Sequence, residues 1–266
     1  MRRLVPHLKY RTKLTRIQST SAGTQTVTRF SRSDAESVHK SLETLTQAIL
    51  KDPVTRYLSP GDEVSSDDLK QHIQQQLDQA HAADLLFHVD DFAAAAWCYK
   101  VPEELVRRKQ QQHVANLHVH FNLLNSLPSG AVLKNVVSLQ PLKEVNQEPA
   151  AMSDSTVKDK FTELDKALSE QLVDFLMAHG SCIKVSFIGT QPEKQGQGLG
   201  GQLIRAINKV ADAEQQWVYL EASTERGTHL YLRNGFQVVK QAKMQPDAPT
   251  IYCMGRPPKP DVPSDV

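Results

Sequence analysis

The sequence predicts a mixed α/β fold, with helices packed on a central sheet. The first observation is a β-branched run, Val185–Ile188, that enters a glycine-rich turn and leaves it as an amphipathic helix. The second is another strand pattern, Trp217–Leu220, that again precedes a helical pattern. The chain has 266 residues, of which 39% are hydrophobic and 23% are charged, and this is enough for one domain with a sizeable core.

A strand and a helix are expected at the start of this domain. Gln25–Phe30 has the composition of a first strand. Ser33-Asp-Ala-Glu36 has the spacing of a capping box, which predicts the start of a helix. Apolar residues then recur at helical intervals, at Val38, Leu42, Leu45 and Ile49. Asp52-Pro53 predicts the end of this helix.

A second helix and a hairpin are expected next. Ser66-Asp-Asp68 starts a helical pattern that continues through Ile73 and Leu77. Two strands, at residues 85–89 and 92–99, form the expected hairpin around Asp90-Asp91.

An insertion of about 80 residues, at about 102–180, follows the hairpin. It has helical patterns at residues 103–127 and 157–178, joined by a proline-containing stretch. The insertion is compatible with a lid, a wall of the substrate site or the surface of a homodimer. Beyond it we expect a strand at Lys184–Thr190, a helix, a strand at Val218–Glu221, a helix and two final strands.

The two ends of the chain differ from the expected domain at residues 24–256. Eight Lys and Arg residues and no acid lie in residues 1–33, although the whole chain has a net charge of only +1. Residues 1–23 therefore resemble either a disordered basic tail or a mitochondrial presequence, and Pro6 interrupts the helical pattern that a presequence needs. Residues 257–266 are proline-rich and are expected to be a disordered tail.

Three cysteines, Cys98, Cys182 and Cys253, are widely spaced and odd in number, which argues against a disulfide framework. They favour a reducing, intracellular location, in the cytoplasm or, if the leader is a presequence, in the mitochondrial matrix. The histidines at 113, 118 and 120 have no acid or cysteine to complete a metal site. We expect no metal, no nucleic-acid partner and, without an apolar run of about 18 residues, no membrane span.

The glycine-rich turn suits a phosphate or pyrophosphate, because glycines allow close approach and the next helix offers free N–H groups. Gly196, Gly198 and Gly201 spell G-x-G-x-x-G, the dinucleotide-binding pattern, and Glu221 follows about 20 residues later. Two observations argue against a dinucleotide. Residues 191–195, including a proline, separate the strand from the first glycine, and only 65 residues follow Gly201.

A paired motif favours another cofactor. Thr190-x-Pro192 followed by Gln195-x-x-Gly198-x-Gly200 resembles the acyl-CoA pyrophosphate loop of the GNAT superfamily of N-acetyltransferases. Downstream, the stretch from Leu220 to Phe236 resembles the second signature of that superfamily, a strand followed by a helix with L-Y-x-x-x-G-F. The sequence Leu220-Glu-Ala-Ser223, together with Asp52–Leu58, is similar to a branch of this superfamily that is common among fungal members.

The resemblance implies a GNAT fold, in which a mostly antiparallel sheet has a splayed cofactor strand. It implies acetyl-CoA as the co-substrate, with the acyl group and pantetheine arm held by the backbone of Ile188, Gly189 and Thr190. The pyrophosphate would be held by the turn, at Gln195, Gly196, Gln197, Gly198, Leu199, Gly200 and Gly201, and Thr224 is a further candidate for contacting the cofactor. Many relatives carry asparagine where this chain has Thr224.

The resemblance also implies direct attack of a primary amine, from a small molecule or a protein, on the thioester. Tyr231 matches the tyrosine that protonates the CoA thiolate. The cofactor strand carries no carboxylate, so Glu221 is the candidate base, and capping of Ser223-Thr224 is its alternative role. Trp97 is open to a place in the core or in the acceptor pocket. The alternative function is an acyl-CoA-binding module without catalysis, since a fold does not guarantee an activity.

Overall fold

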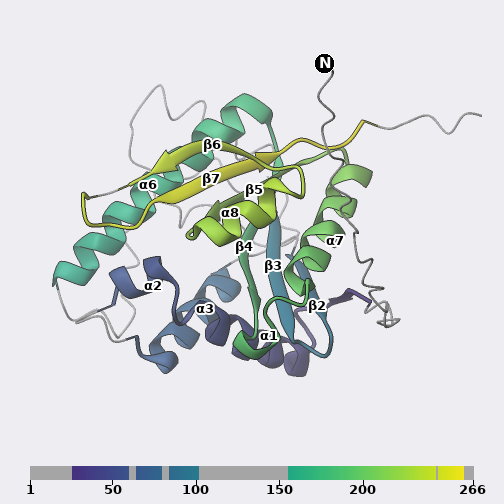
Figure 1. Cartoon of the computed structure of the whole chain (residues 1–266), viewed down its shortest axis with the longest axis horizontal. Coiled ribbons are helices and arrows are strands. Elements are labelled where there is room, and N and C mark those ends of the chain that lie inside the picture. The colour runs from purple at the N-terminus through teal and green to yellow at the C-terminus, as the bar shows by residue number, and fades with distance from the viewer. Residues whose placement is uncertain (1–25, 60–63, 80–83, 102–154, 244, 261–266) are drawn as a thin grey trace, which may run out of the picture.

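The computed structural model describes residues 26–59, 64–79, 84–101, 155–243 and 245–260. The basic leader, the expected helix at 103–127 and the stretch after it lie outside the described residues, as do residues 261–266. The described chain forms one twisted sheet with helices on both faces (Figure 1).

Seven strands form the sheet in the order β1-β2-β3-β4-β5-β7-β6 (Figure 1). Every neighbouring pair is antiparallel except β4 and β5, which are parallel. The strands are β1 (Thr28–Phe30), β2 (Asp84–Val89), β3 (Ala94–Val101), β4 (Cys182–Thr190), β5 (Trp217–Ala222), β6 (Gln237–Ala242) and β7 (Ile251–Arg256). The predicted mixed fold with a mostly antiparallel sheet is confirmed, although the first strand begins later than expected because only three residues pair with β2.

Helices cover both faces of this sheet. They are α1 (Ala35–Ile49), α2 (Pro53–Tyr57), α3 (Ser66–Gln79), α6 (Ser155–His179), α7 (Leu199–Ala213), α8 (Glu225–Leu232) and the short 3-10 helix η2 (Pro192–Lys194). Alternating side chains of β3 identify the faces, since Trp97 packs with α1 and α3, while Ala96 and Cys98 pack with α7. None of the helices in the described ranges is long and apolar enough to cross a bilayer.

The segment after α1 differs from the prediction. The predicted capping box implies Ser33 as the N-cap of α1, but Asp34 caps this helix instead, and its carboxylate accepts a hydrogen bond from the Ser37 N–H at 3.2 Å. Asp52-Pro53 was expected only to end this helix. Instead Asp52 is the N-cap of α2, and its carboxylate accepts hydrogen bonds from the N–H groups of Val54 at 2.9 Å and Thr55 at 3.4 Å. Aspartate is a strong N-cap and proline fits the first helical turn, so the same dipeptide starts a new helix.

Helix α6 confirms the pattern predicted at residues 157–178 and belongs to the domain core. Its buried residues Leu172, Phe175 and Leu176 pack against Cys182 of β4 and Tyr219 of β5. This helix therefore covers the sheet on the same face as α1 and α3, opposite α7.

Candidate active site

The sheet opens between its two parallel strands. β4 and β5 pair only from Cys182 opposite Trp217 to Val185 opposite Leu220. Beyond this point β4 pairs only with β3, and the end of β5 pairs only with β7. A register shift against β3 leaves Ser186 as an extra residue of β4, which is a β-bulge. The backbone of β4 after the bulge therefore has no strand on its β5 side, and this is the expected splayed strand.

The glycine turn continues directly from this free edge. Gly196 and Gly198 have φ angles of 83° and 82°, in the left-handed region that glycine adopts without strain. Gly198 is the N-cap of α7 and makes no side-chain capping hydrogen bond, so the first N–H groups of α7 are available to a ligand. The side-chain amide of Gln195 donates a hydrogen bond to the Thr190 carbonyl at 3.3 Å. These groups suit a bound phosphate.

The predicted cofactor residues of β4 and the turn therefore lie along one continuous path. They are Ile188, Gly189, Thr190, Gln195, Gly196, Gln197, Gly198, Leu199, Gly200 and Gly201. Packing explains two of these residues as well. A side chain at Gly189 would meet the Cβ atom of Ala48 in α1, at 2.4 Å. Leu199 is 1% exposed and packs in the core, so only its backbone is available to a cofactor.

Tyr231 lies on α8, the helix that follows β5. It is buried with the α7 side of the core, and its ring centroid lies 5.8 Å from that of Phe236. Burial raises the pKa of Tyr231 well above its ordinary value, and the Asp52 carboxylate raises this pKa further. The phenol therefore stays protonated at neutral pH and can donate a proton.

Asp52 lies outside the two sequence motifs, and the fold brings it close to Ser223 and Tyr231. The Ser223 hydroxyl, directly after β5, donates a hydrogen bond to the Asp52 carboxylate. The same carboxylate acts on the pKa of Tyr231. None of the described lysines, arginines or histidines forms an ion pair with Asp52. We did not predict a functional role for Asp52, although the sequence analysis noted its place before a proline and its membership of the Asp52–Leu58 stretch.

Glu221 forms a buried ion pair. It is the first residue of β5 beyond the segment that pairs with β4, and its Oε1 atom lies 3.0 Å from the Nζ atom of Lys184. The two side chains are 14% and 7% exposed, respectively. The predicted capping role of Glu221 is wrong, because the Thr224 side chain caps α8 and accepts a hydrogen bond from the Gly227 N–H at 3.1 Å.

Two tyrosines surround this ion pair on the α6 side of the sheet. Tyr99 pairs directly with Lys184 across β3 and β4, and Tyr219 precedes Glu221 by two positions. Both phenolic oxygens are buried without a hydrogen-bond partner among the described residues. Burial raises the pKa of each phenol, and the Glu221 carboxylate raises it further. Both tyrosines are therefore neutral donors.

The three cysteines are poor candidates for a nucleophile. Cys98, Cys182 and Cys253 are free and buried. Burial raises the pKa of Cys182 to about 12 and raises the pKa of the other two thiols. A thiol is reactive as its thiolate, so none of them is activated at neutral pH. No group of three metal-binding side chains occurs in the described ranges.

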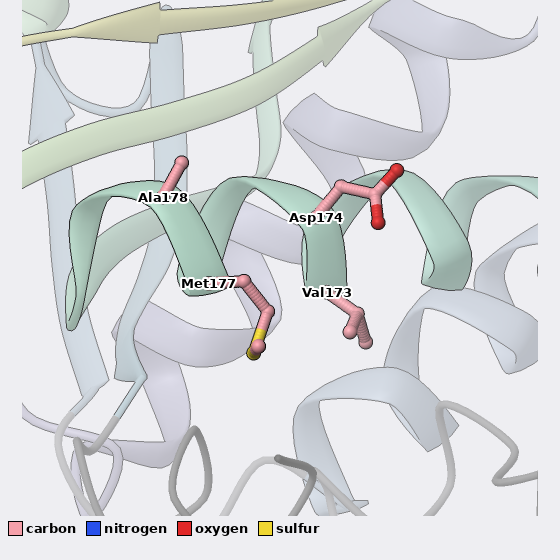
Figure 2. A pocket seen from close by; sticks show the side chains of 4 residues that line it. All are labelled: Val173, Asp174, Met177 and Ala178. Carbon is pink, nitrogen blue, oxygen red and sulfur yellow. The ribbon is translucent and has the colours of Figure 1, made fainter. Parts of the chain in front are cut away.

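Two further features lie apart from the opening. Trp97 is buried, and its indole N–H donates a hydrogen bond to the Ser41 hydroxyl at 3.0 Å, so this residue belongs to the core under α1. A surface pocket lies along α6 and is lined by Val173, Asp174, Met177 and Ala178 (Figure 2). None of the predicted site residues lines that pocket.

Comparison with known proteins identifies the fold of this chain. The sequence pattern of the acetyltransferase (GNAT) domain matches residues 165–238, which contain both predicted motifs. The structure is similar to arylalkylamine N-acetyltransferase 2 from Aedes aegypti, with 13% identity and a TM-score of 0.53 over 89% of this chain and 100% of that chain. The chain has the GNAT acetyltransferase fold.

Two other solved structures share this GNAT fold. The polyamine N-acetyltransferase of Drosophila melanogaster is 12% identical, with a TM-score of 0.52 over 88% of this chain and 99% of that chain. A histone acetyltransferase-related protein from Corynebacterium glutamicum is 16% identical, with a TM-score of 0.50 over 90% and 99%. The domain match and these GNAT neighbours are consistent with an acetyl-CoA-dependent transferase.

Proposed function

We propose that this chain transfers an acetyl group from acetyl-CoA to a primary amine. The opening between β4 and β5 carries the proposal, because it joins three requirements of that reaction. The free edge of β4 offers backbone groups to the pantetheine arm, and the glycine turn offers N–H groups to the pyrophosphate. Tyr231 and Asp52 supply a proton donor and a carboxylate on the β5 side.

The chemistry needs no covalent enzyme intermediate. The neutral amine attacks the thioester carbonyl, the C–N bond forms and the C–S bond breaks. A carboxylate takes the proton of the amine, and Tyr231 donates its proton to the departing thiolate. The raised pKa of Tyr231 supports this role, since the phenol is protonated at the start of the reaction.

Two carboxylates are candidates for the base. Glu221 is the candidate from the sequence, but its charge is already compensated by Lys184. Asp52 accepts hydrogen bonds from Ser223 and from the backbone of α2, and it has no cation partner among the described residues. The geometry favours Asp52, because its negative charge is available to an approaching ammonium group.

Binding is tested first, by the thermal stability of the purified chain with acetyl-CoA, free CoA and NAD(P). A ligand at about 100 times its Kd adds about 2.7 kcal/mol of stability. Stabilisation by acetyl-CoA and CoA supports the proposal, whereas stabilisation by NAD(P) alone would establish the dinucleotide interpretation.

Turnover is tested next, by release of the CoA thiol in the presence of a panel of primary amines. Amine-dependent release supports the transferase. Binding of acetyl-CoA without release for any amine would instead support the alternative, an acyl-CoA-binding module without catalysis.

A further inference from the structure

We propose that Lys184 determines the acceptor class, and that it restricts this chain to amines with a single ammonium group. The inference rests on the proposed transferase function and deepens it. Lys184 compensates the charge of Glu221, whereas Asp52 has no cation partner among the described residues. Asp52 is therefore available to the ammonium group of an acceptor, and Glu221 is not.

The positions of Lys184 and Glu221 support a role at the opening. Lys184 lies opposite Tyr219, one residue before the last β4–β5 pair, and Glu221 lies one residue after it. The ion pair therefore bridges the two strands at the point where they separate. Its two side chains are sheltered from water, at 7% and 14% exposure, so the pairing is only weakly screened.

The groups directly beside the pair are uncharged, and the nearby ammonium of Lys240 lies 3.9 Å from the carboxylate of Asp174 in α6. Tyr99 and Tyr219 flank it as neutral phenols, because burial raises the pKa of each. Cys182 and Cys253 face it as neutral thiols for the same reason. Lys184 and Glu221 therefore compensate each other, and the four groups directly beside them add no charge.

This charge pattern distinguishes two kinds of amine. An acceptor with one ammonium gives that group to Asp52 and places its uncharged remainder elsewhere in the opening. A diamine must also accommodate a second ammonium, which finds Glu221 already paired and Lys184 repelling it. An ammonium that loses water without gaining a counter-charge is strongly disfavoured.

The test uses a set of variants that change the charges of Lys184 and Glu221. Each variant is assayed with two acceptors of equal chain length, an n-alkylamine and the α,ω-diamine. The readout is the ratio of kcat/KM for the diamine to kcat/KM for the monoamine. We expect Lys184→Met to raise this ratio about tenfold, since an unpaired Glu221 would hold a second ammonium. Glu221→Gln should lower the ratio, and the double variant K184M/E221Q should return it close to that of the unaltered chain.

The ratio separates specificity from general damage. Loss of structure would reduce turnover of both amines, and it would not move the ratio in opposite directions for K184M and E221Q. Lys100→Met is the matched control, because Lys100 also pairs with a carboxylate, Glu214 at 2.6 Å, but lies on the surface. Its ratio should not change.

Two results would overturn the inference. One is an unaltered chain that uses the diamine as well as the monoamine, and the other is a ratio that stays constant through the charge series. If K184M does not fold, the comparison of E221Q with the double variant still tests the effect of Lys184. If neither the monoamine nor the diamine is acetylated, the result contradicts the proposed function itself and the inference with it.

Discussion

The ammonium of Lys184 and the carboxylate of Glu221 meet across two neighbouring strands, with Nζ 3.0 Å from Oε1. Both side chains are largely buried, and the pair stands at the point where β4 and β5 separate. A buried charge without its partner is costly, whereas a pair removed as a whole is cheap. A substitution at Lys184 or Glu221 should therefore change both the stability of the sheet and the charge at the point where β4 and β5 separate.

The stability of this pair can be measured with the same variants. We expect Lys184→Met and Glu221→Gln each to lower the free energy of unfolding by about 3 kcal/mol, because each leaves a buried charge unpaired. The double variant should lose much less than the sum. Urea unfolding measures all three, and additive losses would show that the two charges do not interact.

Replacement of Tyr231 by phenylalanine should reduce kcat about 100-fold, because the phenyl ring packs equally well but cannot protonate the thiolate. The Kd for acetyl-CoA should stay within about twofold, since the phenol is assigned to the leaving group alone. Steady-state kinetics and calorimetric binding measure the two effects. Unchanged kcat would remove Tyr231 from the mechanism.

The pH profile offers an independent test of the same residue. Burial holds the pKa of Tyr231 above its ordinary value of about 10, so the acid keeps its proton as the pH rises. We expect kcat of the unaltered chain to show no decline from pH 8 to about pH 10. A fall in that range, absent from Tyr231→Phe, would mean that the phenol loses its proton at its ordinary pKa.

Asp52→Asn separates the two candidate bases. Asparagine is as good an N-cap as aspartate, so α2 should persist and the melting temperature should change little. The amide cannot accept a proton, and we expect kcat to fall about 100-fold. If Asp52→Asn is nearly as active as the unaltered chain while Glu221→Gln is not, Glu221 is the base.

The glycine turn has a matched control in another part of the fold. Gly198 and Gly180 have φ angles of 82° and 79°, and a Cβ atom at either position meets nothing within 4 Å. Alanine at each should therefore cost a similar 1–2 kcal/mol, roughly the penalty of the left-handed region. Only Gly198→Ala should also weaken acetyl-CoA binding, and equal affinities in both variants would contradict the role of the turn.

Asp212 and Arg256 should control stability in acid. The guanidinium of Arg256, whose side chain is 4% exposed, donates hydrogen bonds to both Asp212 oxygens at 2.8 and 2.9 Å. These bonds lower the pKa of Asp212 in the folded chain below its ordinary value of 3.8. The contribution to stability is therefore present above pH 3.8 and is lost as the pH falls through the lower, folded pKa.

Asp212→Asn tests this relationship. We expect it to cost about 2 kcal/mol near pH 7, less than a fully buried pair because Asp212 is 26% exposed. The difference between the two chains should shrink as the pH falls below 3.8 toward the lower, folded pKa of Asp212, because only below that folded pKa is the carboxyl protonated in both states. A difference that is independent of pH would assign the cost to packing instead.

Much of the fold follows from local patterns in the sequence. The capping residue Asp34, the apolar spacing of α1 and α6, and the glycines before α7 each act within a few neighbouring residues. Tyr231 and the glycine turn were predicted in the same way, because both belong to short motifs. Asp52-Pro53 follows the end of α1 as predicted, but the same dipeptide also starts α2, which was not predicted.

The sequence by itself determined the order of the strands and of the helices other than α2, the glycine-rich turn and the helix that carries Tyr231. Only the tertiary structure decided that Asp52 meets Ser223 across a separation of 171 residues, and that Glu221 pairs with Lys184 rather than capping α8. Capping, periodicity and turn chemistry depend on residues a few positions apart, so a sequence displays them directly. Contacts between distant carboxylates, hydroxyls and ammonium groups depend on strand order and register, which are settled by the packing of the whole core.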